Sequence, residues 1–247
     1  MPTVQQESSR TLEKNHLVDQ GTNHDHYERS SQHFWSTLAL CSSSLAMFYQ
    51  LFNVFPYSGY MVIHLIPGVD NENAGFYAGM LASSFMVGRA CSAYAWGQMA
   101  DIYGRKFVLI FSLLISSIGS LAFGCSTTFF MAVLVRFIMG LGNGIMIACR
   151  TAISELAKGD RELESKGVGL LMSMVGYGML LSPSLGGLLS EPLRQYPDII
   201  IINGTLDSVL TKYPFLPPNF LGGLVSLVAL FTVLGFVQET LPTEQRR

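Results

Sequence analysis

Six long apolar runs constrain the fold of this chain more than any other feature of its sequence. They lie at 34–58, 75–98, 107–126, 128–152, 167–190 and 218–238. A bilayer core of about 30 Å needs about 20 mostly apolar residues per helical crossing. A soluble helical bundle would have to bury all six runs. We therefore expect an all-α membrane protein with six transmembrane helices between residues 34 and 240.

The composition agrees with a chain that lies mainly in lipid. Hydrophobic residues make up 49% of the sequence and charged residues 13%, whereas soluble domains contain roughly a quarter charged residues. Residues 1–33 are polar and contain no short apolar region with a cleavage site, so we expect a disordered cytosolic tail and no removable signal peptide. The first helix is expected either to end at Pro56 or to continue past it with a kink.

The distribution of lysine and arginine predicts the orientation. With a cytosolic N-terminus, eleven basic residues fall on the inner side: Arg10, Lys14, Arg29, Arg105, Lys106, Arg150, Lys158, Arg161, Lys166, Arg246 and Arg247. The outer connections contain only Arg194 and Lys212, and Arg89 and Arg136 lie inside apolar runs. Because cytoplasmic loops retain positive charge, we expect both termini in the cytosol, with 241–247 beginning a central loop.

Two further residue patterns bear on modification and metal binding. Asn203-Gly204-Thr205 is a glycosylation sequon in the connection that this topology places outside; its occupancy is left open. The cysteines are spread among the apolar runs without the spacing of metal ligands, and the histidines of the tail have no frame of cysteines or carboxylates. We therefore expect no metal site and no cofactor.

Three motifs resemble those of the major facilitator superfamily, in the expected order and on the expected helices. Gly97-x-x-x-Asp101-x-x-Gly104-Arg105-Lys106 resembles its loop between the second and third helices. Arg136-x-x-x-Gly140-x-Gly142 is similar to its arginine motif in the fourth helix. The fifth helix resembles the antiporter pattern, with Ser182 standing where that pattern has glycine; the matching residues are Gly169, Gly178, Pro183, Gly186 and Gly187.

Within the superfamily, the stretch from Gly75 to Arg89 most resembles the drug:proton antiporter branch and its zinc-induced-facilitator-like transporters. The cysteine motif of the zinc-induced group is missing near the first helix, so zinc-linked physiology does not carry over. The resemblance implies one half of a major facilitator fold, built from two inverted three-helix repeats. It implies a eukaryotic membrane and leaves the plasma membrane and the vacuole open.

The loop motif has a physical interpretation. Gly97 would let another helix approach closely, and Gly104 would allow the sharp reversal into the third helix. Asp101 and Arg105 can form charged hydrogen bonds. The resemblance implies that they latch the cytoplasmic side in the outward-facing state, with Glu155 as the partner on the fourth helix. The alternative is a topological anchor, in which Arg105 and Lys106 only enforce the orientation.

Two arginines inside the apolar runs are candidates for an intramembrane charge or proton path. Arg136 lies about eight residues into its helix, near the bilayer centre, and such an arginine is expected to face the bundle interior or a water-filled cavity. The alternative is a buried structural cation bonded to backbone carbonyls. For Arg89, in the inner half of the second helix, functional and structural roles are equally open, and snorkelling toward the cytosol would lower its cost.

Polar side chains suggest a cavity for a polar solute. Gln50, Asn53 and Tyr57 recur at spacings of three and four, so they share one face of a helix, and Asn143, Tyr177 and Ser173 are candidates to join them. The alternative is interhelical hydrogen bonding. In the fifth helix, the glycines would allow close packing, and Pro183 would bend the helix.

These observations predict secondary transport of a small organic solute by proton antiport, with this chain supplying the N-terminal half. The expected partners are the solute, protons, the lipid bilayer and a second six-helix half, and no nucleic acid. The alternative is a non-transporting half-transporter that acts as a partner or regulator of a full-length transporter. An enzyme is not expected, because the sequence shows no nucleophile–base pair, metal frame or phosphate loop.

Overall fold

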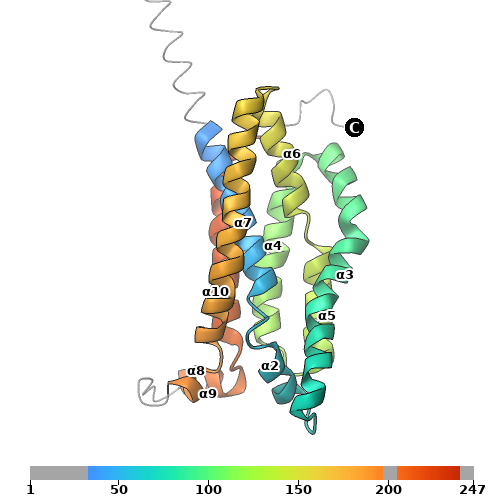
Figure 1. Ribbon diagram of the computed structural model, residues 1–247, viewed down its shortest axis with the longest axis vertical. Helices are drawn as coiled ribbons and strands as arrows, with labels where there is room; N and C mark the ends of the chain where they lie inside the picture. The colour runs from blue at the N-terminus through green and yellow to red at the C-terminus, as the bar shows by residue number, and fades with distance from the viewer. Residues whose placement is uncertain (1–32, 197–204, 240–247) are drawn as a thin grey trace, which may run out of the picture.

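The computed structural model describes residues 33–196 and 205–239, which form an elongated bundle of helices (Figure 1). An N-terminal helix occupies 33–52. The elements that follow are α2 (Ser58–Leu65), α3 (Asn71–Tyr103), α4 (Arg105–Gly124), α5 (Phe129–Leu141), α6 (Ile145–Ala157), α7 (Arg161–Leu189), α8 (Pro192–Gln195), α9 (Thr205–Lys212) and α10 (Leu216–Phe236). The start of the N-terminal helix and the end of α10 lie at one end of the bundle, called here the termini end, and α2, α8 and α9 lie at the other, the loop end.

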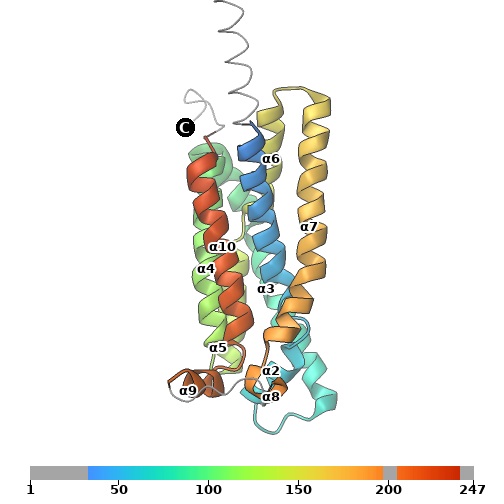
Figure 2. The same ribbon diagram turned by 90° about the vertical axis from the view of Figure 1, so that its left-hand side faces the viewer.

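Four helical stretches among the described residues are long and apolar enough to cross a bilayer: Arg105–Gly124, Phe129–Ala157, Arg161–Leu189 and Leu216–Phe236. Four of the six predicted crossings therefore have the length and composition of a membrane-spanning helix in the structure. α3 has 33 residues but is less apolar, because it contains glycines, serines and Arg89. It and the N-terminal helix nevertheless run along the bundle beside the other four (Figures 1 and 2).

Two predicted helices are interrupted. The first ends after residue 52, and a turn over 53–57 that includes Pro56 separates it from α2, so the chain neither kinks through Pro56 as one helix nor ends its helical structure there. The fourth predicted run forms α5 and α6, separated at Gly142, Asn143 and Gly144. This run also extends to Ala157, five residues beyond its predicted end, so Arg150 lies well inside the helix rather than near its end.

Side chains from other helices stabilise the break between α5 and α6. The indole Nε1 of Trp96 donates to the carbonyl of Leu141 at 2.7 Å, and the backbone N–H of Gly144 donates to the hydroxyl of Ser112 at 3.0 Å. A Cβ at Gly144 would lie 2.9 Å from the Trp96 ring, so a glycine is needed for this packing. The break is therefore held by α3 and α4 together.

The helices α3 and α5 cross at two glycines. A Cβ at Gly88 would clash with the backbone carbonyl of Phe137, and a Cβ at Gly140 would clash with that of Phe85. Each glycine thus touches the backbone of the opposite helix, as small residues do in membrane helix pairs. This contact fixes α3, the helix that leads to the loop motif, against the α5–α6 span.

On the other side of the bundle, α4 packs against α10 through small polar residues. The Ser117 hydroxyl donates to the Gly223 carbonyl at 3.1 Å, and the Ser120 hydroxyl donates to the Asn219 carbonyl at 2.7 Å. Figure 2 shows the N-terminal helix between α10 and α7. The buried apolar core lies among these helices and includes Leu40, Leu109 and Val233.

We expect Gly140→Val to disrupt the bundle, because its side chain would have to displace the α3 backbone, and overpacking of this kind costs about 1–3 kcal/mol or more. Gly79→Val on α3 is the matched control, since nothing lies within 4 Å of a Cβ there. The midpoint of thermal unfolding of the purified chain in detergent should fall for Gly140→Val and stay near wild type for Gly79→Val. Equal midpoints would contradict the crossing.

Candidate functional site

Arg105 joins three elements at the termini end. Its side chain is buried, and its guanidinium donates to the Ala100 carbonyl at 2.6 Å. The same group pairs with Asp101 Oδ1 at 3.0 Å and with Glu155 Oε1 at 2.8 Å. The end of α3, the start of α4 and the end of α6 therefore meet at one cation, and the predicted residues Asp101, Arg105 and Glu155 lie together.

Glu239, which follows α10, completes this site and was not among the predicted residues. Its Oε1 accepts the backbone N–H of Arg105 at 3.0 Å, at the N-terminus of α4. A carboxylate is favoured there by the unsatisfied N–H groups and the helix dipole. The sequence signal was an acid directly after the last apolar run. Asp101, Gly104, Arg105, Glu155 and Glu239 are called the Arg105 cluster below.

The glycines of the loop motif have different surroundings. Gly104 has a backbone φ of 97°, a conformation that residues with a side chain rarely adopt. A Cβ there would also clash with the Glu239 carboxylate. Gly97, in contrast, has nothing within 4 Å of a Cβ position. The close helix approach expected at Gly97 is therefore absent among the described residues. Lys106 is exposed and donates to the Leu234 carbonyl at 3.1 Å, near the end of α10.

Arg136 is buried inside the bundle, with 1% of its surface exposed. One guanidinium nitrogen donates to the Gln50 carbonyl at 2.9 Å, and the other contacts the Leu51 carbonyl at 3.5 Å. The charge also lies 5.3 Å from the ring centres of Phe85 and Phe123. This is the arrangement of a cation bonded to backbone carbonyls, which was the alternative prediction.

The position of Arg136 follows from the end of the N-terminal helix. A helix leaves its last four carbonyls without intrahelical partners. Here the Tyr49 carbonyl accepts from the Asn53 N–H and, at 2.6 Å, from the Ser182 hydroxyl. The Phe52 carbonyl accepts from the Phe55 N–H. Arg136 supplies the donors for the carbonyls of Gln50 and Leu51, which lie between Tyr49 and Phe52. All four carbonyls thus have donors, and three of them accept from side chains of other helices.

The predicted polar face forms a network between helices. Gln50 Nε2 donates to the Ser226 hydroxyl at 2.9 Å and to the carbonyls of Ser116 and Gly222. Tyr57 and Asn219 share hydrogen bonds of 3.0 and 3.2 Å, and Asn53 Nδ2 lies 3.3 Å from the Pro218 carbonyl. Because the helix ends before Asn53, the turn rather than the predicted helical face brings Tyr57 here. All three side chains are buried.

The other candidates for the cavity lie apart from this network. No hydrogen bond between described residues joins it to Asn143 or Tyr177, and Tyr177 is exposed on α7. Asn143 is buried in the break between α5 and α6, and both polar atoms of its amide lack a hydrogen-bond partner in the described part of the chain. Ser173 donates to the Gly169 carbonyl of its own helix.

The glycine-proline pattern of α7 partly faces the N-terminal helix. A Cβ at Gly178 would meet Phe48, one at Gly186 would meet the Asn53 backbone, and one at Gly187 would only touch Pro56. Ser182 is buried between them, where its hydroxyl bonds the Tyr49 carbonyl. At Gly169 the space is open, so the predicted close packing is absent at that position. Pro183 lies inside the helix.

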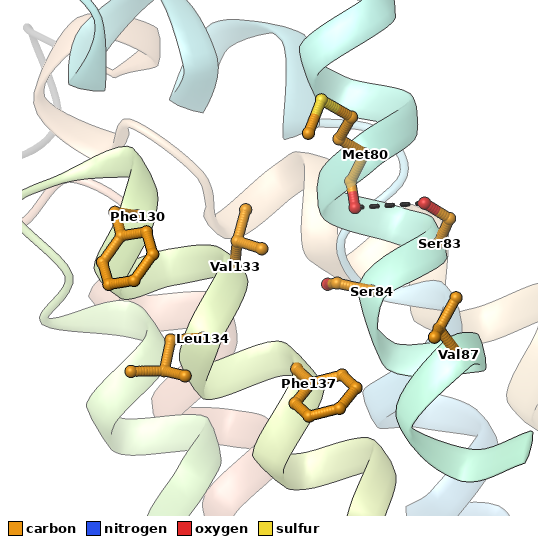
Figure 3. A pocket seen from close by; sticks show the side chains of 8 residues that line it. All are labelled: Met80, Ser83, Ser84, Val87, Phe130, Val133, Leu134 and Phe137. Atoms are coloured by element: carbon orange, nitrogen blue, oxygen red, sulfur yellow. Dashed lines mark hydrogen bonds between the residues drawn. The ribbon is translucent and has the colours of Figure 1, made fainter. Parts of the chain in front are cut away.

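A groove of about 330 Å³ lies between α3 and α5, on the loop-end side of their crossing. Figure 3 shows Val133 and Phe137 of α5 facing Ser84 of α3 across it. A second cavity, of about 650 Å³, lies at the termini end between the N-terminal helix, α6 and α7. It is lined by apolar side chains such as Phe34 and Leu163 and by Lys158 and Lys166. The predicted glycosylation site, Asn203, lies outside the described residues.

Comparison with known proteins gives a consistent result. The profile of the Major Facilitator Superfamily matches residues 38–246. Protein ZINC INDUCED FACILITATOR-LIKE 1 of Arabidopsis thaliana is 32% identical over 189 residues, which are 75% of this chain and 37% of that protein. The multidrug transporter mfsB of Aspergillus fumigatus is 29% identical over 195 residues, 79% of this chain and 32% of that protein.

The fold agrees with a solved structure. The human organic anion transporter MFSD10 (TETRAN) superposes with a TM-score of 0.66 and 17% identity, over 87% of this chain and 50% of that chain. The chain thus spans about half the length of the solved transporter and less than two fifths of the two relatives above. The resemblance inferred from the three motifs is confirmed.

We expect Arg136→Leu to destabilise the protein by about 2–5 kcal/mol, because it leaves two buried carbonyls without donors and each costs about 1–3 kcal/mol. Arg136→Lys should recover part of this loss, since one ammonium cannot reproduce the fork of a guanidinium. Arg194→Leu, at an exposed arginine of α8, is the control. Unfolding in a denaturing detergent measures the effect, and unchanged stability of Arg136→Leu would contradict the structural role.

Proposed function

The chain belongs to the major facilitator superfamily, and we propose that it supplies one half of a secondary transporter that exchanges a small organic solute for protons. The family consists of transporters and not of enzymes, and its members are multi-pass integral membrane proteins. In this proposal, the N-terminal helix, α3, α4, the α5–α6 span, α7 and α10 are the six crossings. The observation that carries the proposal is the Arg105 cluster, in a chain whose relatives are full-length transporters.

The open surfaces of two helices support the presence of a second half. α7 is the least buried of the four membrane-length stretches: only 17% of the residues in its most apolar part are buried in the bundle. Its exposed face contains Ser173, Gly176, Tyr177 and Ser184, and α3 exposes Tyr94 and Gln98. Polar and small side chains are poorly suited to face lipid, but they suit helix–helix contact or an aqueous cavity. A second six-helix half would cover these faces and enclose the solute between the halves.

The Arg105 cluster is proposed as a latch on the cytosolic side. Basic residues gather at the termini end, where the positive-inside rule places the cytosol. Arg105 holds the end of α3 to the end of α6, and Glu239 holds the end of α10 to the start of α4. Rearrangement during alternating access has to break some of these bonds. Charged pairs that are only partly exposed can therefore bias the equilibrium between two conformations of the transporter.

The acidic residues limit where protons can bind. The six apolar runs contain no aspartate or glutamate, although proton-coupled transporters often use carboxylates inside the membrane. Asp101, Glu155 and Glu239 all lie at the termini end. If this chain contributes a proton site, we place it in the Arg105 cluster; otherwise, the second half supplies it.

Asp101→Asn tests the latch. The substitution removes the charge that pairs with Arg105, and Asp101 is largely exposed, so insertion and folding should be preserved while transport falls severalfold. Transport is measured as proton movement in response to a panel of organic solutes in proteoliposomes, for the chain together with any second half that its transcript encodes past Arg247. Asp207→Asn, at an exposed acid on α9, is the control.

The results separate the two functional hypotheses. Equal flux in wild type and Asp101→Asn, at equal membrane abundance, would refute the latch. A stop codon directly after Arg247, together with no flux for any solute, would refute the transporter proposal. That outcome would favour a non-transporting half that acts as a partner of a full-length transporter.

A further inference from the structure

Two arginines inside the helices have no acidic partner in the described part of the chain. Arg89 lies on α3 and is half-buried, and Arg150 lies on α6 and is exposed on the open face of the bundle. No ion pair or side-chain hydrogen bond between described residues includes either guanidinium. The acids at the ends of the same two helices, Asp101 and Glu155, are both bound by Arg105.

The fold brings these two arginines toward each other. The backbone of α3 at Arg89 meets the α5–α6 span at Gly140, where a Cβ would lie 3.0 Å from the backbone nitrogen of Arg89. α3 also contacts α6 directly, and Arg150 is the neighbouring charge that acts on Arg89. Two positive charges from different helices therefore share one region of the open face.

Both arginines lie inside their helices rather than at the helix ends. Arg150 lies seven residues before Ala157, about 10 Å from the end of its helix, and Arg89 lies about 21 Å from the end of α3 at Tyr103. Both helices run toward the termini end. Neither arginine therefore lies in the last turn of its helix.

Arg136 provides the comparison. It is also an arginine inside a membrane-length span, but two backbone carbonyls and two aromatic rings surround its charge. Arg89 and Arg150 have no such hydrogen bond among the described residues, and the charge of Arg150 acts against that of Arg89. Charged residues inside membrane helices face a cavity or a binding pathway, and they are paired or functional. An anion between the two would remove the repulsion.

We propose that Arg89 and Arg150 form a binding site for the anionic group of the transported solute, on the face of α3 and α6 that this half of the bundle leaves open. The solute class is a small organic anion that carries a carboxylate or a phosphate. The planar guanidinium group binds both with two parallel hydrogen bonds. The location in the inner half of the span agrees with solute sites near the bilayer midplane.

This inference rests on the proposed function for its solute, but its test measures binding without flux. The full chain, purified in detergent, is titrated with benzoate, phosphate and chloride, and with benzylamine as a cation of the size of benzoate. Stabilisation against heat reports binding to the folded state, and calorimetry gives the affinity. The variants are Arg89→Gln, Arg150→Gln and Arg150→Lys, with Arg194→Gln as a control at an exposed arginine that pairs with Glu191.

We expect benzoate or phosphate to stabilise the wild-type chain more than chloride does, and benzylamine to have no effect. Each glutamine variant should lower the affinity for that anion about tenfold, and Arg150→Lys should retain more of it than Arg150→Gln. Without added anion, Arg150→Gln should unfold at a higher temperature than wild type, because the repulsion is gone. A merely structural arginine would give the opposite sign.

Three results would overturn the inference. The first is that neither benzoate nor phosphate stabilises wild type more than it stabilises the Arg89→Gln/Arg150→Gln double variant. The second is equal binding of benzoate and benzylamine. The third is saturable anion binding that neither glutamine substitution weakens. Flux of a cationic or neutral solute with no anion binding would leave the transporter proposal standing and remove this site, whereas anion binding without flux would do the reverse.

Discussion

Backbone groups that are freed where a helix ends inside an apolar bundle have to find partners within the protein, and this constraint organises the polar residues of the structure. Water is scarce at that depth, and an unsatisfied carbonyl or N–H costs several kcal/mol in hydrocarbon. The N-terminal helix ends at residue 52, and Arg136 and Ser182 bond the carbonyls it leaves. The α5–α6 span breaks at Asn143, and Trp96 and Ser112 bond the groups beside the break.

The same constraint explains the Arg105 cluster. The turn from α3 to α4 leaves the carbonyl of Ala100 at one helix end and the N–H of Arg105 at the next helix start. Arg105 itself donates to the first, and Glu239 accepts from the second. Partners drawn from α6 and from the end of α10 tie distant parts of the chain to this turn. A bond that satisfies the backbone thereby becomes a link between helices, which is what a latch requires.

Much of the fold and of the Arg105 cluster could be predicted from the sequence. The exceptions all depend on contacts with the backbone or between helices, which the sequence does not show. Asp101 and Arg105 were identified because they lie in a motif that resembles the loop of the superfamily and can form charged hydrogen bonds, and the same resemblance pointed to Glu155. Glu239 was missed because its partner is a backbone N–H, which no side-chain pattern reveals. The interruption at Asn143 was missed, and the end of the first helix was expected at Pro56 or beyond it rather than after residue 52, because composition shows apolar length but not where tertiary contacts can replace helical hydrogen bonds. Gly97 and Gly140 look alike in the sequence, yet only Gly140 touches another helix.

The arginines show how surroundings decide the role of a single residue type. Arg136 is enclosed by carbonyls and aromatic rings, and its two terminal nitrogens bond backbone carbonyls while its Nε has no partner among the described residues, so it joins two spans. Arg105 is buried but paired with acids from other helices, so its bonds can be broken and remade when the helices move. Arg89 and Arg150 lie on neighbouring helices without an acidic partner in the described part of the chain, so we assign their charge to a ligand. In the proposed transporter, burial and the supply of acceptors thus separate an arginine that joins two spans, one that latches and a pair that binds.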